Sequence, residues 1–296
     1  MDTELLAAVE TRMRAALDES GVGNNVVIKA ALDHLSAGGG RIRAQLSLDA
    51  SARLGLDVLD SIALASICEL IHNASLIQDD LLDRAAFRRG LPSVWATFGD
   101  ATAVCAGDLL LASAFAVLGD LRATQRIGPG LSLLYRRTRE VILSQGTEQN
   151  CKADSLESYE TVAVAKSSSL LSLPLELSLL VSGNQDSMPR AQGAAIAFAT
   201  AYQMMDDVED YAEDQRYGAL NVVTVSLRSG SSTYQAACVQ VLHRVEALLR
   251  VSIEEAQALP MDCGSQMIDY AQTMLTKLAS HPDFAMEIIG SAHDAR

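Results

Sequence analysis

Three aspartates at the end of a long apolar segment are the first residues whose spacing could do chemistry. Asp79, Asp80 and Asp83 stand at positions i, i+1 and i+4 in the stretch ELIHNASLIQDDLLDR. On a helix, Asp79 and Asp83 lie one turn apart on the same face, with Asp80 beside them. Carboxylates stacked in this way repel each other, and Mg²⁺ would relieve the repulsion because it takes oxygen ligands and keeps positions open for phosphate. This cluster is therefore predicted to chelate metal.

The same spacing recurs later in the chain. In AYQMMDDVEDYAED, Asp206, Asp207 and Asp210 follow a second apolar approach. A single cluster of this kind is as often a solvated acidic face of a helix as a metal site. Its repetition, each time after apolar residues rather than further charge, favours two metal-binding clusters on separate helices that face each other across one pocket.

Arginines accompany the acidic clusters. Arg88 and Arg89 follow the first cluster, and Arg41 and Arg43 follow the glycines of SAGGGRIR. Carboxylates, metal and guanidinium groups together predict a diphosphate site. Glycines before a helix would also let backbone N–H groups approach an anion at the positive end of the helix dipole. A plain glycine-rich turn with surface arginines is the alternative for the second segment.

Two further residues have both a structural and a functional interpretation. Lys166 lies in the otherwise uncharged stretch AVAKSSSLLSLPLEL, where a buried lysine is costly unless it meets an anion. The alternative is a lysine at a helix end that reaches solvent, and the serines at 167–169 would permit a break there. His72 lies two turns before Asp79 on the same face, where it could be a ligand or an ordinary core histidine.

The elements that must position these residues are helices. The chain has 296 residues, 49% of them hydrophobic and only 6 prolines, and it lacks strand-like alternation between turn signals. We predict one all-α domain over residues 1–296, a bundle of about ten or more helices. A helix from Asp57 to Leu82 would span about 37 Å, enough to line a deep pocket. Further helices are expected at 2–18, 24–36, 94–118, 131–150, 233–258 and 262–280.

Composition excludes several function classes. The balance of 23 basic and 37 acidic residues gives a net charge of −14, which does not suit nucleic acid. The five scattered cysteines have no metal-ligand spacing and indicate a reducing compartment. The N-terminus is unlike a signal peptide, and no membrane span is expected, because no apolar run reaches about 18 residues. We expect a cytoplasmic protein.

These motifs, taken in order, resemble one family. GGGRIR at 38–43, the first aspartate motif with RRG at 88–90, Lys166-Ser167 and YQMMDD at 202–207 are similar to the trans-isoprenyl diphosphate synthases, or polyprenyl synthetases. The resemblance implies helices around a deep central cavity and a Mg²⁺-dependent prenyltransferase that condenses an allylic diphosphate with isopentenyl diphosphate. It also implies a homodimer and about three Mg²⁺ ions per active site, with Mn²⁺ as an alternative.

The resemblance also implies roles for individual residues. Arg43, His72 and Arg89 would hold isopentenyl diphosphate, while Arg88, Lys166, Ser167 and Gln203 would hold the allylic diphosphate. Asp79, Asp83, Asp206, Lys166 and Arg88 would promote ionisation, and the metal ligands would be Asp79, Asp80, Asp83, Asp206, Asp207 and Asp210.

The chain departs from the family pattern at three places. Gly40 stands where the family has a lysine for isopentenyl diphosphate. Thr147 and Asn150 replace part of a Gly-Gln-x-x-Asp motif. After the second aspartate motif, Ala219 follows Gly218 in place of a lysine, and no lysine occurs between Lys166 and Lys277.

Small residues beneath the first motif bear on product length. Ala74 and Ser75 occupy positions where, in the family, large side chains give short products, so we expect a product longer than fifteen carbons, C20 or more. Phe115 on a neighbouring helix could still close that space. Two alternatives remain open: a class I terpene cyclase or hydrolase that ionises an allylic diphosphate alone, and a non-catalytic partner subunit of a heteromeric synthase.

Overall fold

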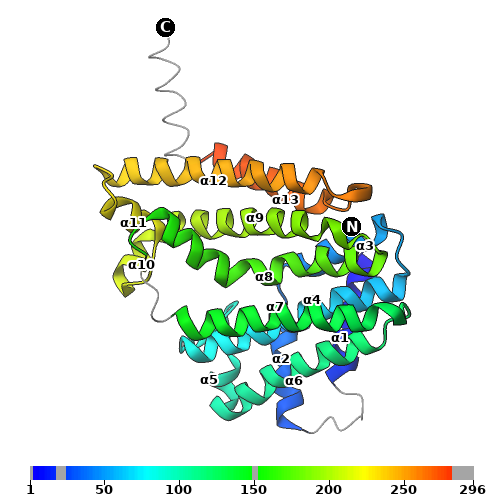
Figure 1. Cartoon of the computed structure of the whole chain (residues 1–296). Coiled ribbons are helices and arrows are strands. Elements are labelled where there is room, and N and C mark those ends of the chain that lie inside the picture. The colour runs from blue at the N-terminus through cyan, green and yellow to red at the C-terminus, as the bar shows by residue number, and fades with distance from the viewer. Residues whose placement is uncertain (1–2, 18–24, 149–152, 282–296) are drawn as a thin grey trace. The chain divides into compact units, whose positions relative to one another are not determined.

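Helices carry almost all of the regular structure of the chain (Figure 1). The computed structural model describes residues 3–17, 25–148 and 153–281, and of residues 146–148, 162–169 and 217 it describes the backbone alone. The predicted all-α class is confirmed. Within these ranges, the strands are β1 (Phe87–Arg88) and β2 (Leu91–Pro92), which form a short antiparallel hairpin. The helices are α1 (Thr3–Leu17), α2 (Val26–Ser36), α3 (Ile42–Arg53), α4 (Val58–Leu82), α5 (Val94–Phe98), α6 (Asp100–Gly119), η1 (Thr124–Arg126), α7 (Ile127–Glu148), α8 (Leu156–Ser182), η2 (Gln185–Ser187), α9 (Met188–Glu209), α10 (Tyr211–Tyr217), α11 (Val222–Arg228), α12 (Tyr234–Gln257), η3 (Pro260–Asp262) and α13 (Ser265–Ala279).

The helices group into two compact units. Unit 1 comprises Met1–Val141 and Leu173–Met188, and unit 2 comprises Ile142–Ser172 and Pro189–Arg296. Helices α7 and α8 contribute residues to both. The single domain and its deep central cavity stay predictions.

Helix α4 is the core helix of unit 1. It begins where the carboxylate of Asp57 accepts a hydrogen bond from the amide of Leu59 at 2.8 Å, and it runs to Leu82 as predicted. Its middle is buried on all sides and packs chiefly against α3 and α6. At Gly107 of α6 a Cβ atom would lie 3.4 Å from Cγ of Gln78, so this glycine allows the two helices to approach closely. The apolar body of α4 thereby fixes the position of the aspartates at its end.

The segment 94–118 is two helices rather than the single one expected. Gly99 separates α5 from α6 with a φ of 86°, in the left-handed region that favours glycine. The amide of Gly99 donates to the carbonyl of Trp95, which ends α5. The apolar pattern continues through this glycine, and for that reason sequence periodicity did not reveal the break.

Helix α6 also corrects the expectation that no apolar segment is long enough to cross a membrane. Among the described residues it is the one helix that meets that length and composition, because two aspartates in 20 residues barely lower its hydropathy. Only 44% of its most apolar stretch is buried within the chain. A core helix of a globular domain can be equally long and apolar, and α6 does pack against α4, α2 and α1.

In unit 2, α12 and α13 pack along each other, and α11 packs on α12 (Figure 1). Their bounds agree with the amphipathic helices predicted at 233–258 and 262–280. Valines and methionines from these helices, among them Val241, Val245 and Met267, are fully buried. The break that serines 167–169 would permit does not occur in the described backbone, since α8 runs continuously from Leu156 to Ser182.

Candidate active site

The first aspartate motif forms the C-terminal end of α4. Asp79 and Asp80 lie in its last turn, and the amide of Asp83 donates to the carbonyl of Asp79 at 2.9 Å. Asp79 and Asp83 therefore lie one turn apart, as predicted, and Asp83 is exposed. Carboxylates at this end face the negative pole of the helix dipole, so a cation bound beside them would be favoured by both charge sources.

Asp80 has a different role from its neighbours. It is only 1% exposed and forms a bidentate ion pair with Arg88, whose Nε lies 2.8 Å from Oδ1 and 2.9 Å from Oδ2. We predicted Asp80 as a metal ligand, but in this structure both of its oxygens bind the guanidinium. The pair fixes the β1–β2 hairpin to the end of α4 and so positions Arg88 beside the motif.

The glycine-rich loop before α3 wraps around Arg89. The guanidinium of Arg89 donates to the carbonyl of Gly38, and a Cβ atom at Gly39 would lie 2.6 Å from its Nη2. Gly39 has a φ of 135°, so this position requires glycine for both its backbone and its close contact. Gly40 differs: its φ lies outside the left-handed region, and a Cβ atom there would meet only Ile42, at 3.7 Å.

Four arginines gather in this part of unit 1, and carboxylates neutralise two of them. Arg88 pairs with Asp80, and Arg41 pairs with Glu69, whose Oε2 lies 3.5 Å from Nη1. Arg41 also pairs with Glu10 of α1. These two arginines are thus held by the protein itself.

The other two arginines have no carboxylate partner among the described residues. Burial lowers the pKa of the Arg43 guanidinium, and the buried Nε of Arg43 has no hydrogen-bond partner in the part of the chain described. Arg89 is exposed, and partial desolvation, followed by repulsion from Arg41 and Arg88, lowers its pKa. Arg43, a cation that has lost water and gained no carboxylate, is therefore prepared for an anion, and Arg89 adds a second cation without a carboxylate partner among the described residues. These are the two arginines predicted to hold the second diphosphate.

Two histidines beside the arginines are kept neutral. Burial lowers the pKa of His34 to about 4, with further contributions from Arg89 and Arg88. Burial and then Arg43 and Arg89 lower the pKa of His72 well below its usual value. At neutral pH His72 can therefore donate one hydrogen bond without adding charge.

The start of α3 is already occupied by a carboxylate. Glu69, 2% exposed, accepts a hydrogen bond from the amide of Ala44 at 3.0 Å. The amide of Ala44, in the first turn of α3, is therefore not available to a substrate anion, and the expected approach of the glycine N–H groups to an anion stays a prediction. Glu69 lies in the middle of the apolar run of α4, and the local sequence does not indicate that its partner is Ala44.

Space for a small group lies beside the arginines. A cavity of about 200 Å³ is lined by Arg88 and Arg89, by His34 of α2 and by Phe98 of α5, among others. Below the motif, Ala74 and Ser75 are both buried in α4, and the hydroxyl of Ser75 donates to the carbonyl of His72 at 2.8 Å. Their role as the floor that sets product length stays a prediction.

The second aspartate motif forms the end of α9 in unit 2. Asp206 is exposed in its last turn, and the amide of Asp210, just beyond the helix, donates to the carbonyl of Asp206 at 2.8 Å. The geometry repeats that of the first motif. Because the two motifs belong to different compact units, their facing each other across one pocket stays a prediction.

Asp207 is the structural member of the second motif, as Asp80 is of the first. It is 4% exposed, and it accepts hydrogen bonds from the Tyr159 hydroxyl at 2.8 Å, the Val222 amide at 2.7 Å and Gln203 Nε2 at 2.9 Å. Asn221 also donates to the carbonyl of Asp207 at 2.6 Å. The carboxylate thus joins α8, α9 and α11. Gln203, predicted in the allylic pocket, and Asp207, predicted as a metal ligand, bind each other here.

Asp206 lies in a negative field. Burial and then Asp210 and Glu209 raise its pKa, while Lys277 lowers it. Lys277 comes from α13, and its Nζ lies 2.7 Å from Oε1 of Glu209. Sequence reasoning found no chemistry in α13, yet this helix brings a lysine to the second motif, where the segment after the motif lacks one.

Several predicted residues lie outside the described side chains. They are Lys166 and Ser167 of α8 and the two departures Thr147 and Asn150. Lys166 and Ser167 belong to the continuous backbone of α8, and their proposed contact with the allylic diphosphate stays a prediction.

The carboxylates of both motifs fit a metal that relies on its substrate. Among the side chains described, no group of three or more His, Cys, Asp or Glu lies close enough together to form a metal site by protein ligands alone. Mg²⁺ is commonly bound through one or two carboxylates plus substrate phosphates rather than in an all-protein cage. Asp79 with Asp83, and Asp206 with Asp210, supply such pairs.

Other positioning residues were missed for a physical reason. Glu69, Tyr159 and Asn221 act through contacts 14 to 48 residues away in sequence, such as Tyr159 with Asp207. No local spacing signals such a contact. For Glu69 the sequence does carry a signal, because a charged residue inside an apolar run indicates a buried partner.

Comparison with known proteins agrees with this geometry. The polyprenyl synthetase family model matches residues 25–220. An octaprenyl diphosphate synthase of Haemophilus influenzae is 28% identical over 275 residues, covering 86% of this chain and 80% of the relative. A (2E,6E)-farnesyl diphosphate synthase of Mycobacterium tuberculosis is 34% identical over 174 residues, covering 57% of this chain and 48% of the relative, so that match spans about half of its length.

Solved structures show the same fold. A geranylgeranyl pyrophosphate synthetase from Geoglobus acetivorans has a TM-score of 0.78 at 22% identity and covers 92% of this chain and 97% of its own. A polyprenyl synthetase from Streptomyces coelicolor has a TM-score of 0.77 at 20% identity, with coverages of 90% and 97%. Together with the family match over residues 25–220, these likenesses identify the chain as a member of the polyprenyl synthetase family.

Proposed function

We propose that the chain is a trans-prenyltransferase that condenses an allylic diphosphate with isopentenyl diphosphate. The observation that carries the proposal is the pair Arg43 and Arg89, two cations that both act on His72 of α4 and have no carboxylate partner among the described residues. An enzyme that ionises one allylic diphosphate needs the aspartate motifs alone. A second, separate set of cations supports a second diphosphate substrate.

In the proposed reaction the C–O bond of the allylic diphosphate breaks and its electron pair leaves with the diphosphate. The double bond of isopentenyl diphosphate attacks the resulting cation, a C–C bond forms, and loss of a proton restores a double bond. Arg88, positioned by Asp80, stabilises negative charge on the leaving diphosphate together with Lys166. Ser167 and Gln203 would complete that half of the site, and neutral His72 would orient isopentenyl diphosphate beside Arg43.

The reaction as proposed depends on Mg²⁺, with Mn²⁺ as an alternative. Asp79, Asp83 and Asp206 would hold the metal, and the metal would supply charge stabilisation on the diphosphate oxygens. The acidic pairs at two helix C-termini and the raised pKa of Asp206 support this, because both indicate carboxylates crowded enough to gain from a cation.

The product is proposed to be C20 or longer. The buried Ala74 and Ser75 are small, so at these two positions α4 places no bulky side chain below the proposed metal site. Relatives in the family differ in product: the Haemophilus relative is named for an octaprenyl product and the mycobacterial one for a farnesyl product.

A homodimer is also proposed, and helix α6 supports it. The helix is mostly apolar, with Asp100 and Asp108 as its charged residues, yet Val104 is 49% exposed and Cys105 is exposed. Leu131 and Tyr135 of α7, also in unit 1, are similarly uncovered at 49% and 60%. An apolar helix that its own chain leaves half covered is explained by a second copy of the chain.

Product analysis tests the proposal. Purified protein is incubated with Mg²⁺, labelled isopentenyl diphosphate and one allylic primer at a time, and the extracted products are separated by length. Labelled product longer than the primer is expected, and Arg43→Met and Arg89→Met should reduce its formation by raising the KM for isopentenyl diphosphate. Cyclised or hydrolysed product from an allylic diphosphate alone, without label, would favour the terpene cyclase. No turnover at all would favour a partner subunit.

A further inference from the structure

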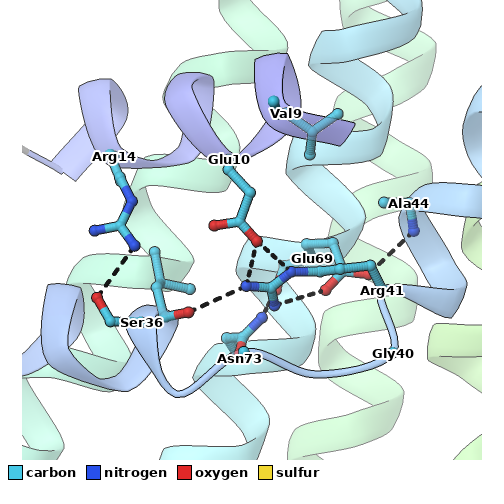
Figure 2. A network of polar contacts seen from close by, with 12 residues as sticks. Val9, Glu10, Arg14, Ser36, Gly40, Arg41, Ala44, Glu69 and Asn73 are labelled. Atoms are coloured by element: carbon cyan, nitrogen blue, oxygen red, sulfur yellow. Dashed lines mark hydrogen bonds and ion pairs between the residues drawn. The ribbon is translucent and has the colours of Figure 1, made fainter. Parts of the chain in front are cut away.

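The side chain of Arg41 points into the protein, toward Glu10 and Glu69 (Figure 2). It is 9% exposed and contacts three helices at once. Its Nε donates to Oε1 of Glu10 on α1 at 2.6 Å, its Nη2 to the carbonyl of Leu35 on α2 at 3.1 Å, and its Nη1 lies 3.5 Å from Oε2 of Glu69 on α4.

Glu69 holds the chain on both sides of Arg43. One of its oxygens faces the Arg41 side chain, and the other accepts the amide of Ala44 at 3.0 Å (Figure 2). Asn73 donates to the carbonyl of Glu69 at 2.7 Å and keeps this part of α4 tied to its own turn. One buried carboxylate therefore brackets Arg43, two residues before it and one residue after it.

The loop before α3 is held in a conformation that costs energy. Arg41 has a φ of 50°, in the left-handed region, which is unfavourable for a residue with a side chain. Gln45 Nε2 donates to the carbonyl of Gly40 at 2.8 Å and helps to fix the same turn. Such strain persists only where several contacts specify the conformation, and the Arg41 side chain supplies three of them.

The charge of Arg41 matters as much as its position. Glu69 is the carboxylate that acts most strongly on Arg43. As long as Arg41 neutralises Glu69, Arg43 remains a cation without an ion-pair partner. Without Arg41, the freed oxygen of Glu69 would turn to Arg43 and compete with any incoming anion, because a buried carboxylate must find a counter-charge.

We propose that Arg41 is a positioning residue for the second diphosphate substrate: by engaging Glu69 it fixes the backbone around Arg43 and leaves the Arg43 charge available to the substrate. Arg41 itself touches no substrate. The inference rests on the proposed function, and it adds a residue and a charge relationship to that site.

Steady-state kinetics on the full-length protein test it, with isopentenyl diphosphate and the allylic primer varied separately. Arg41→Met should raise the KM for isopentenyl diphosphate about ten- to a hundredfold, the range of one charge-assisted contact. The KM for the allylic primer should stay within about twofold. Arg53→Met is the matched control, because it removes an arginine of α3 whose ion-pair partner among the described residues is Asp49 on the same helix.

The decisive variant is the double substitution Arg41→Met with Glu69→Gln. Glutamine can still accept the amide of Ala44 but cannot neutralise Arg43, so the KM for isopentenyl diphosphate should return toward the wild-type value. A residue that only supports the fold would give no such rescue, and an unrescued KM overturns the proposal. Because this variant carries neither buried charge, it remains measurable even if Arg41→Met alone does not fold.

Two failures are distinguishable. Wild-type protein that forms no elongated product from isopentenyl diphosphate contradicts the proposed function. Wild-type protein that elongates normally, with an Arg41→Met variant whose KM for isopentenyl diphosphate is unchanged, contradicts the role of Arg41 alone. Arg41→Lys is a third variant, which keeps a cation beside Glu69 and should raise the KM for isopentenyl diphosphate less than Arg41→Met does. An equal rise in the two variants would show that neutralisation of Glu69 is not the cause.

Discussion

At the scale of single residues, the aspartates of the two motifs differ from one another in the same way. In each, the second aspartate is buried and bonded to the protein, Asp80 to Arg88 and Asp207 to Tyr159 among others. The first and last aspartates stand at a helix C-terminus, where a cation would be favoured. Identical side chains one position apart thus differ in function because only one of them faces the core.

This difference predicts that isosteric substitutions of Asp79 and Asp80 affect different properties, catalysis for Asp79 and stability for Asp80. Asp79→Asn should lower kcat by at least about a hundredfold, because it removes a carboxylate proposed to hold the metal that stabilises charge in the transition state. Asp80→Asn should lower the free energy of unfolding by about 1–3 kcal/mol, because it breaks the ion pair with Arg88. Thermal melts and Mg²⁺-dependent kinetics measure both, and near-normal activity of Asp79→Asn would refute the metal assignment.

The missing lysine at position 40 can be supplied. Because Gly40 has ordinary backbone angles and a Cβ there would meet only Ile42, at 3.7 Å, Gly40→Lys should fold. We expect it to lower the KM for isopentenyl diphosphate about ten- to a hundredfold, the range of one charge-assisted contact, with the allylic KM nearly unchanged.

The neighbouring glycine provides the control for that substitution. Gly39→Ala should raise the KM for isopentenyl diphosphate, since its Cβ would displace the Arg89 guanidinium. An equal response of the two substrates to Gly40→Lys would place the second diphosphate elsewhere.

The buried His34 predicts how stability depends on pH. Its pKa is lowered to about 4 in the folded protein, so between pH 6.5 and 4 the unfolded chain binds more protons than the folded one. Stability should therefore fall as the pH falls through this window, by about 2 kcal/mol from pH 7 to pH 5 for this one group. Urea unfolding of the wild type and of His34→Gln at both pH values tests it: the variant should lose less stability, and an equal loss would exclude His34 as the source.

At the scale of helices, the sequence predicted the helix bounds that depend on the local pattern of residues. The expected helix from Asp57 to Leu82 agrees with α4 within one residue, and the helices expected at 233–258 and 262–280 agree with α12 and α13. The break at Gly99 escaped because the apolar pattern runs through it. Partners such as Tyr159 for Asp207 could not be predicted, because they depend on which helices pack together rather than on spacing within one helix.

The junction at Asp207 is testable through the least disruptive of its contacts. Tyr159→Phe removes one hydroxyl and leaves the ring in place, so it should lower the free energy of unfolding by about 1–3 kcal/mol, because a buried carboxylate loses a donor. Burial raises the pKa of Asp207, and loss of the donor should raise it further. The loss of stability should then be smaller at low pH, where Asp207 is protonated. A loss that does not change with pH would assign the effect to packing instead.

At the scale of the whole molecule, helix α6 carries more apolar surface than its own chain covers. Val104 is 49% exposed on a helix whose length and apolar composition would suffice to cross a membrane. In the proposed dimer a second copy of the chain would cover it. Val104→Arg should convert the proposed dimer to a monomer, since an arginine at the centre of an apolar interface would lose water without gaining a partner. Sedimentation velocity measures the change in mass.

Val251→Arg is the matched control for this prediction. Val251 lies on α12 and is 46% exposed, so the substitution makes the same chemical change at nearly the same exposure. The control should remain a dimer. A monomeric wild type would refute the dimer itself, while a wild-type dimer that survives Val104→Arg and dissociates with Val251→Arg would move the interface from α6 to α12. Activity measured in parallel then shows whether the active site depends on the second copy: if the monomeric Val104→Arg variant keeps its turnover, each chain holds a complete site.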